Sequence, residues 1–276
     1  MRIGCGARIE ELALVKEYGF DYVELRGRAL MAMSLREVEE LRGQLEARGL
    51  PCLAINAYCP PEITIAGPRY DRARARRYAE ELSLRAGLIG AKKIGIGSPC
   101  SRTLPEGYDR ALARRQCGEF LADTAEVFAK EKVETGIEPL GYCFCNFINH
   151  LEEAYELAVS LDGYPVGITL DFYNMEQSGE ADIELERFAD RIIHAHISDD
   201  WGSPNLRSPL DAEKLALHAA RVEKLMEAGY DDTLTLELDV PMDEAARESL
   251  RMMRAMAGGG AAPVPCGRDI KNQGKD

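Results

Sequence analysis

The stretch RIIHAHISDD, residues 191–200, decides the fold of this 276-residue chain. Side chains alternate between the two faces of a strand. His194 and His196 therefore lie on one face, while Ile193 and its neighbours at every second position lie on the other. We expect a strand that carries two imidazoles on the same side.

Three further predicted strands each end with one acid at the carboxyl-terminal tip. The acids are Glu138 in VETGIEP, Asp171 in VGITLDFYN and Glu237 in LTLELDV. Taken alone, such an acid more often caps a helix or lies on the surface, and a lone strand histidine is usually a hydrogen-bonded core residue. Agreement in position and chemistry across four strands instead predicts a metal site made of Glu138, Asp171, His196 and Glu237.

Predicted strands and helices alternate along the chain. Strands are expected at residues 1–6, 21–26, 52–57, 92–97, 133–138, 166–171, 191–200 and 233–238, and helices at 9–18, 34–49, 70–86, 109–130, 151–161, 182–189 and 211–228. Ser34 and Glu37 form a capping box, and Gly49 ends the same helix. Eight βα units over residues 1–256 give about 32 residues per unit, close to a barrel of about 250 residues.

Side-chain parity favours the same architecture. The apolar face, expected to contact the surrounding helices, carries Val23, Leu25, Leu53, Ile55, Ile94, Ile96, Ile168, Leu170, Leu234 and Leu236. The other parity, expected to line the lumen, carries the acids and Gly95, Gly97, Gly136 and Gly167. A doubly wound open sheet shares the alternation, but neither GxGxxG nor GxxxxGK[ST] follows the first strand. The prediction is an α/β fold, a single-domain (β/α)8 TIM barrel over residues 1–256, followed by a Gly- and Pro-rich flexible tail at 257–276.

The predicted ligand set restricts the metal. The carboxyl-terminal rim of a barrel holds the active site, and it gathers residues from different strands. Three carboxylates and one imidazole suit a divalent ion of intermediate hardness, so Mn²⁺ is favoured, with Mg²⁺, Co²⁺ and Zn²⁺ as alternatives.

Several other polar residues are candidates for supporting roles. His194, one step deeper than His196 on the same face, is either a further ligand or, as we favour, a partner of the ligand. Glu24 and Arg26 at the end of the second strand either pair with each other or contact substrate, and Asn56 on the third strand offers a hydrogen bond. The two histidines on predicted helices are expected to be solvated; these are His150 and His218.

The segments IEPLGYCFCNFINHLEEAYEL, VGITLDFYNMEQSGE, IIHAHISD and LELDV resemble the xylose isomerase-like barrel superfamily of sugar isomerases and epimerases. They are similar in particular to ketose 3-epimerases and hydroxypyruvate isomerases. The resemblance implies that Glu138, Asp171, His196 and Glu237 bind the metal, and that both glutamates are catalytic residues that transfer protons.

The chain departs from the family pattern at two positions. Asn174 stands where the family usually has a substrate-contacting histidine, and Phe144 stands where the epimerases carry a second acid. Arg207 falls roughly where the family has a substrate-binding arginine. The candidate substrate contacts are therefore Asn174, Arg207, His194, Asn56 and Glu24. The resemblance therefore implies the fold and the metal site of the family, but it does not identify the substrate.

The leading hypothesis is a metal-dependent isomerase or epimerase of a sugar or related hydroxy-carbonyl compound. A metal-bound carbonyl makes the adjacent C–H acidic and stabilises the resulting enediolate. Glu138 and Glu237, three strands apart, are expected to transfer protons on opposite faces. Alternatives are a lyase that dehydrates a keto-sugar or cleaves a C-glycoside, the DNA-cutting endonuclease branch of the superfamily, and a non-catalytic binding barrel.

The composition of the chain limits the kinds of partner that it is expected to bind. A net charge of −13 disfavours nucleic acid, because binding a phosphate backbone requires clusters of Lys and Arg. No apolar run of membrane length is present, and residues 1–11 are too polar for a signal peptide, so we expect a cytoplasmic enzyme of a small-molecule substrate. The eight scattered cysteines lack a CxxC pair and are expected to be mostly buried residues or free thiols. Assembly into a homo-oligomer is left open.

Overall fold

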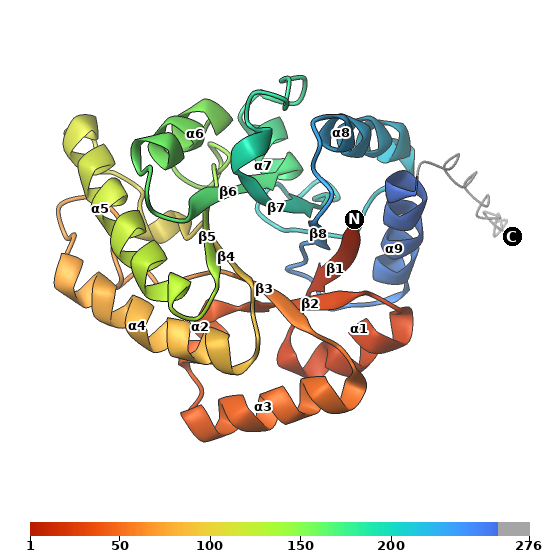
Figure 1. The fold of residues 1–276 in the computed structure, drawn as a ribbon. Coiled ribbons are helices and arrows are strands. Elements are labelled where there is room, and N and C mark those ends of the chain that lie inside the picture. Colours follow the sequence, from red (N-terminus) through yellow and green to blue (C-terminus); the bar gives the residue numbers. More distant parts are fainter. Residues whose placement is uncertain (259–276) are drawn as a thin grey trace, which may run out of the picture.

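Eight parallel strands form the centre of the molecule (Figure 1). They pair in chain order and β8 closes on β1, so the sheet is a barrel without edges. The computed structural model describes residues 1–258. Its strands are β1 (Arg2–Gly6), β2 (Tyr22–Arg26), β3 (Cys52–Asn56), β4 (Lys93–Ile96), β5 (Glu134–Ile137), β6 (Val166–Asp171), β7 (Ile192–Ile197) and β8 (Thr233–Leu236).

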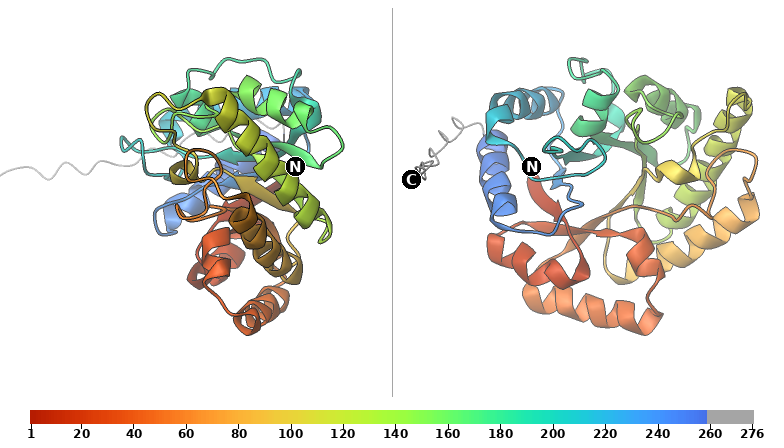
Figure 2. Two further views of the ribbon diagram at one scale, coloured as in Figure 1. Left: turned by 90° about the vertical axis from the view of Figure 1, so that its left-hand side faces the viewer. Right: turned by 180° about the vertical axis from the view of Figure 1, so that it is seen from behind.

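Helices surround this barrel in a ring, as the views from the side and from behind also show (Figure 2). They are α1 (Leu12–Tyr18), α2 (Gly27–Met31), α3 (Leu35–Arg48), α4 (Arg72–Leu88), α5 (Arg110–Ala129), α6 (Leu151–Ser160), α7 (Phe172–Gln177), α8 (Leu215–Glu227) and α9 (Glu244–Ala257). Short 3-10 helices occupy Ile9–Glu11, Pro99–Ser101, Ala189–Arg191 and Ala212–Lys214. The predicted capping box of α3 is confirmed, since the Ser34 and Glu37 side chains each accept from the other's backbone N–H.

The predicted fold is confirmed. All eight predicted strands are present, and the closed barrel excludes the doubly wound sheet. In residues 1–258, no helix is long and apolar enough to cross a membrane. The predicted flexible tail lies, from residue 259 onward, outside the described residues.

One predicted helix is wrong. Residues 182–188 contain no helix, and only the short turn Ala189–Arg191 precedes β7. The helix of this unit instead follows β6 directly as α7, because the Asp171 carboxylate accepts from the backbone N–H groups of Tyr173 and Asn174 and so caps it. The short helix α2, directly after β2, was also not predicted from the sequence.

Two strands break the predicted alternation. Leu53 has no partner on β2, and Ile193 has no partner on β6, because the register shifts by one residue at each position. Leu53 packs with the lumen residues Tyr22 and Ala54, and a Cβ atom added to Gly167 would contact Ile193. Their predicted outward orientation is therefore wrong, whereas the outward residues beyond each bulge are placed as expected.

Two further expectations concern buried side chains. His218 is fully buried and its Nε2 lies 2.9 Å from Asp199 Oδ2, so its predicted exposure to solvent is wrong. His150, at the start of α6, is partly exposed and its Nε2 lies 2.8 Å from the Tyr142 hydroxyl. The seven cysteines among the described residues are all free, and only Cys100 and Cys143 are exposed.

Candidate metal centre

Four side chains converge at the carboxyl ends of consecutive strands β5 to β8. Each offers one ligand atom, and the four atoms all lie within 4.8 Å of one another. The residues are Glu138, Asp171, His196 and Glu237. The barrel therefore brings together the set that the sequence predicted, one residue from each strand.

The first glutamate, Glu138, is positioned by hydrogen bonds and by the space that a glycine leaves free. The backbone N–H of Glu138 donates to Ile96 O at 3.2 Å, and the Asn174 Nδ2 group donates to Glu138 Oε1 at 3.0 Å. A Cβ atom on Gly97 would lie 2.3 Å from Glu138 Oε2. Gly97 therefore leaves the space that this carboxylate occupies.

Asp171 is a helix cap and a member of the cluster at once. Its Oδ1 accepts from two backbone N–H groups of α7, and its Oδ2 accepts from Asn174 Nδ2 at 3.1 Å and from Arg207 Nη2 at 2.7 Å. The side chain is 1% exposed. Both oxygens are thus fixed in position by neighbours from α7 and from the loop after β7.

The remaining two members each present a buried polar atom without a partner. His196 Nδ1 forms no hydrogen bond and lies 3.6 Å from Glu138 Oε1 and 3.8 Å from Glu237 Oε2. Glu237 Oε2 also has no hydrogen-bond partner, whereas its Oε1 accepts from Asn56 Nδ2 at 3.2 Å. Buried polar groups are rarely left unpaired, and an imidazole nitrogen facing carboxylate oxygens is the donor set of a divalent cation. The residues present therefore fit a metal ion.

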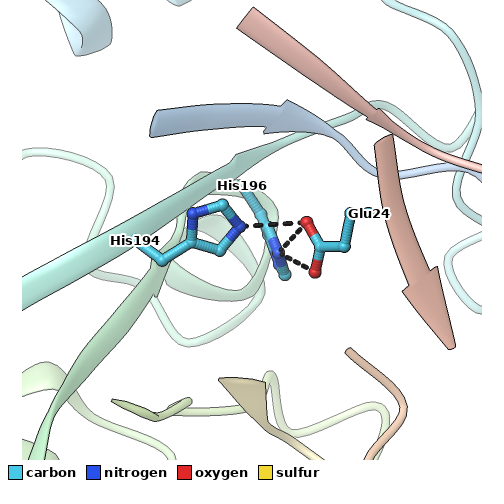
Figure 3. Close-up of side chains that lie close together, drawn as sticks. All are labelled: Glu24, His194 and His196. Carbon is cyan, nitrogen blue, oxygen red and sulfur yellow. Dashed lines mark hydrogen bonds and ion pairs between the residues drawn. The ribbon is translucent and has the colours of Figure 1, made fainter. Parts of the chain in front are cut away.

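Beneath this cluster, Glu24 contacts both histidines of β7 (Figure 3). Its Oε1 lies 3.0 Å from His196 Nε2, and its Oε2 lies 2.9 Å from His194 Nε2. All three side chains are at most 1% exposed. Neither Glu24 nor His194 borders the cavity above the cluster.

The electrostatics of the cluster favour retained protons or a bound cation. Burial raises the pKa of Glu138 and raises that of Glu237 to about 8. Burial alone would lower the pKa of His196, but the carboxylates of Glu24, Glu237 and Glu138 raise it well above the usual range. Burial alone would raise the pKa of Glu24, but both imidazoles hold it well below the usual range.

Arg207 supplies a fixed positive charge beside the cluster. It is 5% exposed, and besides Asp171 it contacts Asn174 Oδ1 at 3.0 Å and lies 3.4 Å from Glu237 Oε2. Its guanidinium stacks 4.1 Å from the ring centroid of Tyr173. Together with a divalent ion, this one guanidinium would balance the charge of the three carboxylates.

A cavity of about 200 Å³ opens above the cluster. Glu138, Glu237, Asn56 and Arg207 border it, together with Phe144. The opposite wall comes from the ends of β2 to β4 and the loops that follow them; these residues include Arg26, Arg28, Ala57, Cys59, Ser98 and Cys100. This space is large enough for a small polar molecule beside the candidate ligands.

The predicted supporting residues fall into two groups. Asn56 and Arg207 border the cavity, and Asn56 Oδ1 has no hydrogen-bond partner. Asn174, 1% exposed, links Glu138 to Asp171 and does not border the cavity. Arg26 pairs with Asp239 at 3.0 Å, so the predicted alternative of a Glu24–Arg26 pair is wrong.

The contact of Glu24 with the two histidines was not predicted from the sequence. The available signal was parity, since Glu24 has the inward parity of β2. The wall formed by Arg28 and Ser98 was also missed, because Arg28 belongs to the unpredicted helix α2 and Ser98 has a left-handed backbone (φ 49°).

Comparisons with known proteins give one family and many similar structures. The sequence model of the xylose isomerase-like TIM barrel family matches residues 12–256. Among curated proteins no sequence match was found.

Three similar solved structures illustrate the fold. One is 3-keto-D-glucoside 4-epimerase from E. coli, 23% identical over 92% of this chain and 99% of that chain (TM-score 0.72). Another is D-psicose 3-epimerase from Clostridium cellulolyticum H10 with D-tagatose, 17% identical over 93% and 99% (TM-score 0.77). The third is the IOLI protein with a bound zinc atom, 16% identical over 94% and 99% (TM-score 0.69).

Proposed function

Because the chain belongs to the xylose isomerase-like TIM barrel family, we propose that it is a metal-dependent isomerase or epimerase of a sugar or related hydroxy-carbonyl compound. The observation that carries the proposal is the pair Glu138 and Glu237. Both border the cavity and both face the unpartnered Nδ1 of His196. Similar solved structures are described as sugar epimerases, and one of the similar proteins holds zinc.

Glu138, Asp171, His196 and Glu237 would hold the ion, with Mn²⁺ the preferred metal for this donor set. When bound there, a divalent ion would supply a Lewis acid for the substrate carbonyl and a positive charge for the enediolate. Both Arg207 and Asn56 border the cavity, so Arg207 would donate to substrate oxygens and the free Oδ1 of Asn56 would accept from a substrate hydroxyl. Asn174 holds Glu138 and Asp171 in place, and like Glu24 and His194 it does not border the cavity that would receive the substrate.

Proton transfer falls to the two glutamates. They come from strands three positions apart around the barrel, so they reach the cavity from different sides. One glutamate removes the proton of the carbon next to the carbonyl, and the other returns a proton. Return to the same carbon from the opposite face gives epimerisation, and return to the neighbouring carbon gives aldose–ketose isomerisation.

The test is solvent deuterium incorporation. Purified protein loaded with Mn²⁺ is incubated in D₂O with a panel of ketoses, aldoses and keto-sugars, and C–H exchange is followed by NMR. We expect exchange with at least one compound, reduced at least about 10²-fold in Glu138→Gln and Glu237→Gln.

The matched control is Glu134→Gln, at the exposed, opposite end of β5, which should retain wild-type exchange. Absence of exchange across the panel would contradict the proposal. A product of altered mass would identify the lyase alternative instead, and metal-dependent nicking of DNA would identify the endonuclease alternative.

A further inference from the structure

A continuous line of hydrogen bonds runs through the barrel lumen below the candidate metal centre. It begins at Lys93 near the amino-terminal end of β4 and passes through Thr233 and His194 to Glu24, which contacts His196. Figure 3 shows its upper part, formed by His194, Glu24 and His196. The five side chains come from β2, β4, β7 and β8, and each is at most 3% exposed. Neither the proposed ligand set nor the proposed proton transfer uses the four that lie below His196.

Lys93, at the lower end of the line, determines which group donates and which accepts in each of these hydrogen bonds. The Lys93 ammonium, paired with Asp232, can only donate, and its Nζ lies 2.9 Å from Thr233 Oγ1. The Thr233 hydroxyl therefore accepts from Lys93 and donates onward. Its shortest contact, 2.7 Å, is to His194 Nδ1, whereas the Tyr230 hydroxyl lies 3.4 Å away and donates to the Thr233 carbonyl.

The donor and acceptor roles at His194 in turn fix those at Glu24 and His196. A neutral His194 that accepts at Nδ1 carries its proton on Nε2, which lies 2.9 Å from Glu24 Oε2 and 3.3 Å from Thr235 Oγ1. The Glu24 carboxylate only accepts, so it also takes the Nε2–H of His196, at 3.0 Å from Oε1 and 3.2 Å from Oε2. With Nε2–H fixed on Glu24, it is Nδ1 that faces Glu138 and Glu237, so this nitrogen is the one that can lose its proton and bind a metal ion together with them.

We propose that Glu24 is a positioning residue that selects Nδ1 of His196 as the metal-binding atom. The hydrogen bonds from Lys93 through Thr233 to His194 keep the Glu24 carboxylate in place as the acceptor of both imidazole N–H groups. The inference rests on the proposed metal-dependent function. It predicts which atom of His196 binds the metal and assigns a role to a residue that touches neither metal nor substrate.

A carboxylate is needed because two N–H donors meet there. In Glu24→Gln one of the two acceptor oxygens becomes an NH₂ donor, which has to face either His194 or His196. Because Thr233 already fixes the N–H of His194 toward residue 24, the amide NH₂ is left facing His196 Nε2. His196 then carries its proton on Nδ1, where the metal should bind.

The test combines metal affinity with the protonation pattern of the histidines. We expect Glu24→Gln to weaken Mn²⁺ binding, measured by calorimetry, by about 10- to 100-fold. The control is Glu180→Gln, because Glu180 is a half-buried carboxylate that also lies beside an imidazole, 3.4 Å from His150 Nδ1, but does not belong to the metal cluster. Glu180→Gln should bind Mn²⁺ within about twofold of wild type.

The protonation pattern is read from ¹⁵N-histidine NMR spectra of the metal-free wild-type protein, which has only four histidines. We expect a proton on Nε2 of both His194 and His196, with Nδ1 of His194 unprotonated. This measurement does not depend on whether the variants fold.

Wild-type Mn²⁺ affinity in Glu24→Gln, or a proton on Nδ1 of His194, would overturn the inference. A wild-type protein that binds no divalent metal would overturn the proposed function itself. The two failures are therefore distinguishable.

Discussion

At the residue scale, burial changes the pKa values of the candidate ligands and therefore their protonation. Glu138, Glu237 and His196 are crowded into a space with little solvent, and burial raises the pKa of both carboxyl groups. A metal ion has to displace these protons, because a ligand binds in its deprotonated form. Metal affinity and pH are therefore coupled at this site.

This coupling predicts that Mn²⁺ binds more tightly as pH rises from 6 to 8. Each proton released on binding changes the dissociation constant by about tenfold per pH unit below the pKa of the group that loses it. Calorimetry at pH 7 in two buffers of different ionisation enthalpy counts the released protons, and we expect at least one. A pH-independent affinity with no proton release would contradict the assignment.

The same groups predict how the metal-free protein responds to pH. A carboxyl whose pKa is raised on folding stabilises the folded state below its unfolded pKa, and this contribution is lost as pH rises toward about 8. A bound metal ion neutralises the buried carboxylate, so the metal-loaded protein should not lose this stability as pH rises. The increase in Tm caused by Mn²⁺ should therefore be larger at pH 8 than at pH 6.

At the scale of the elements, the candidate site lies at the tips of strands, and the meeting of these four tips could be predicted from the sequence. Glu138, Asp171, His196 and Glu237 could be found because each ends a clear apolar strand, and parallel strands of a barrel end on one rim. The bulges at Leu53 and Ile193 could not, because the residues around them still alternate acceptably in sequence. Helix α7 was missed because Asp171, its cap, was interpreted only as a ligand.

Contacts between segments distant in sequence were also beyond prediction. The helix sequence around His218 does not indicate a partner, and only the fold shows that this side chain meets Asp199, the residue that follows the end of β7 by two positions. The contact between Glu24 and His196 joins residues far apart in the chain. Parity alone indicates that both point inward, not that they touch.

Gly97 at the end of β4 provides an element-scale prediction. In Gly97→Ala the new methyl group would displace the Glu138 carboxylate, because its Cβ would lie 2.3 Å from Oε2. We expect Mn²⁺ affinity to fall by at least about tenfold, measured by calorimetry.

The matched substitution is Gly43→Ala within α3, where a Cβ meets nothing within 4 Å. It should leave metal binding unchanged and stabilise the protein by about 0.5–1 kcal/mol in thermal or urea unfolding. Equal metal affinities of the two alanine variants would show that Gly97 does not shape the site.

At the scale of the whole molecule, the closed barrel creates the site. Consecutive strands β5 to β8 bring side chains that span about a hundred positions of sequence within 4.8 Å, and the lumen below them is filled by hydrogen-bonded polar groups rather than by apolar residues alone. The net charge of −13 belongs to the chain as a whole, whereas Arg207 and a divalent ion would balance the carboxylates of the rim.

The most direct test of this account is an anomalous-scattering map from crystals grown with Mn²⁺. We predict a single strong peak at the rim, about 2.0–2.3 Å from one oxygen each of Glu138, Asp171 and Glu237 and from Nδ1 of His196. A map without a peak among these four side chains, or with the ion bound to other residues, would contradict it.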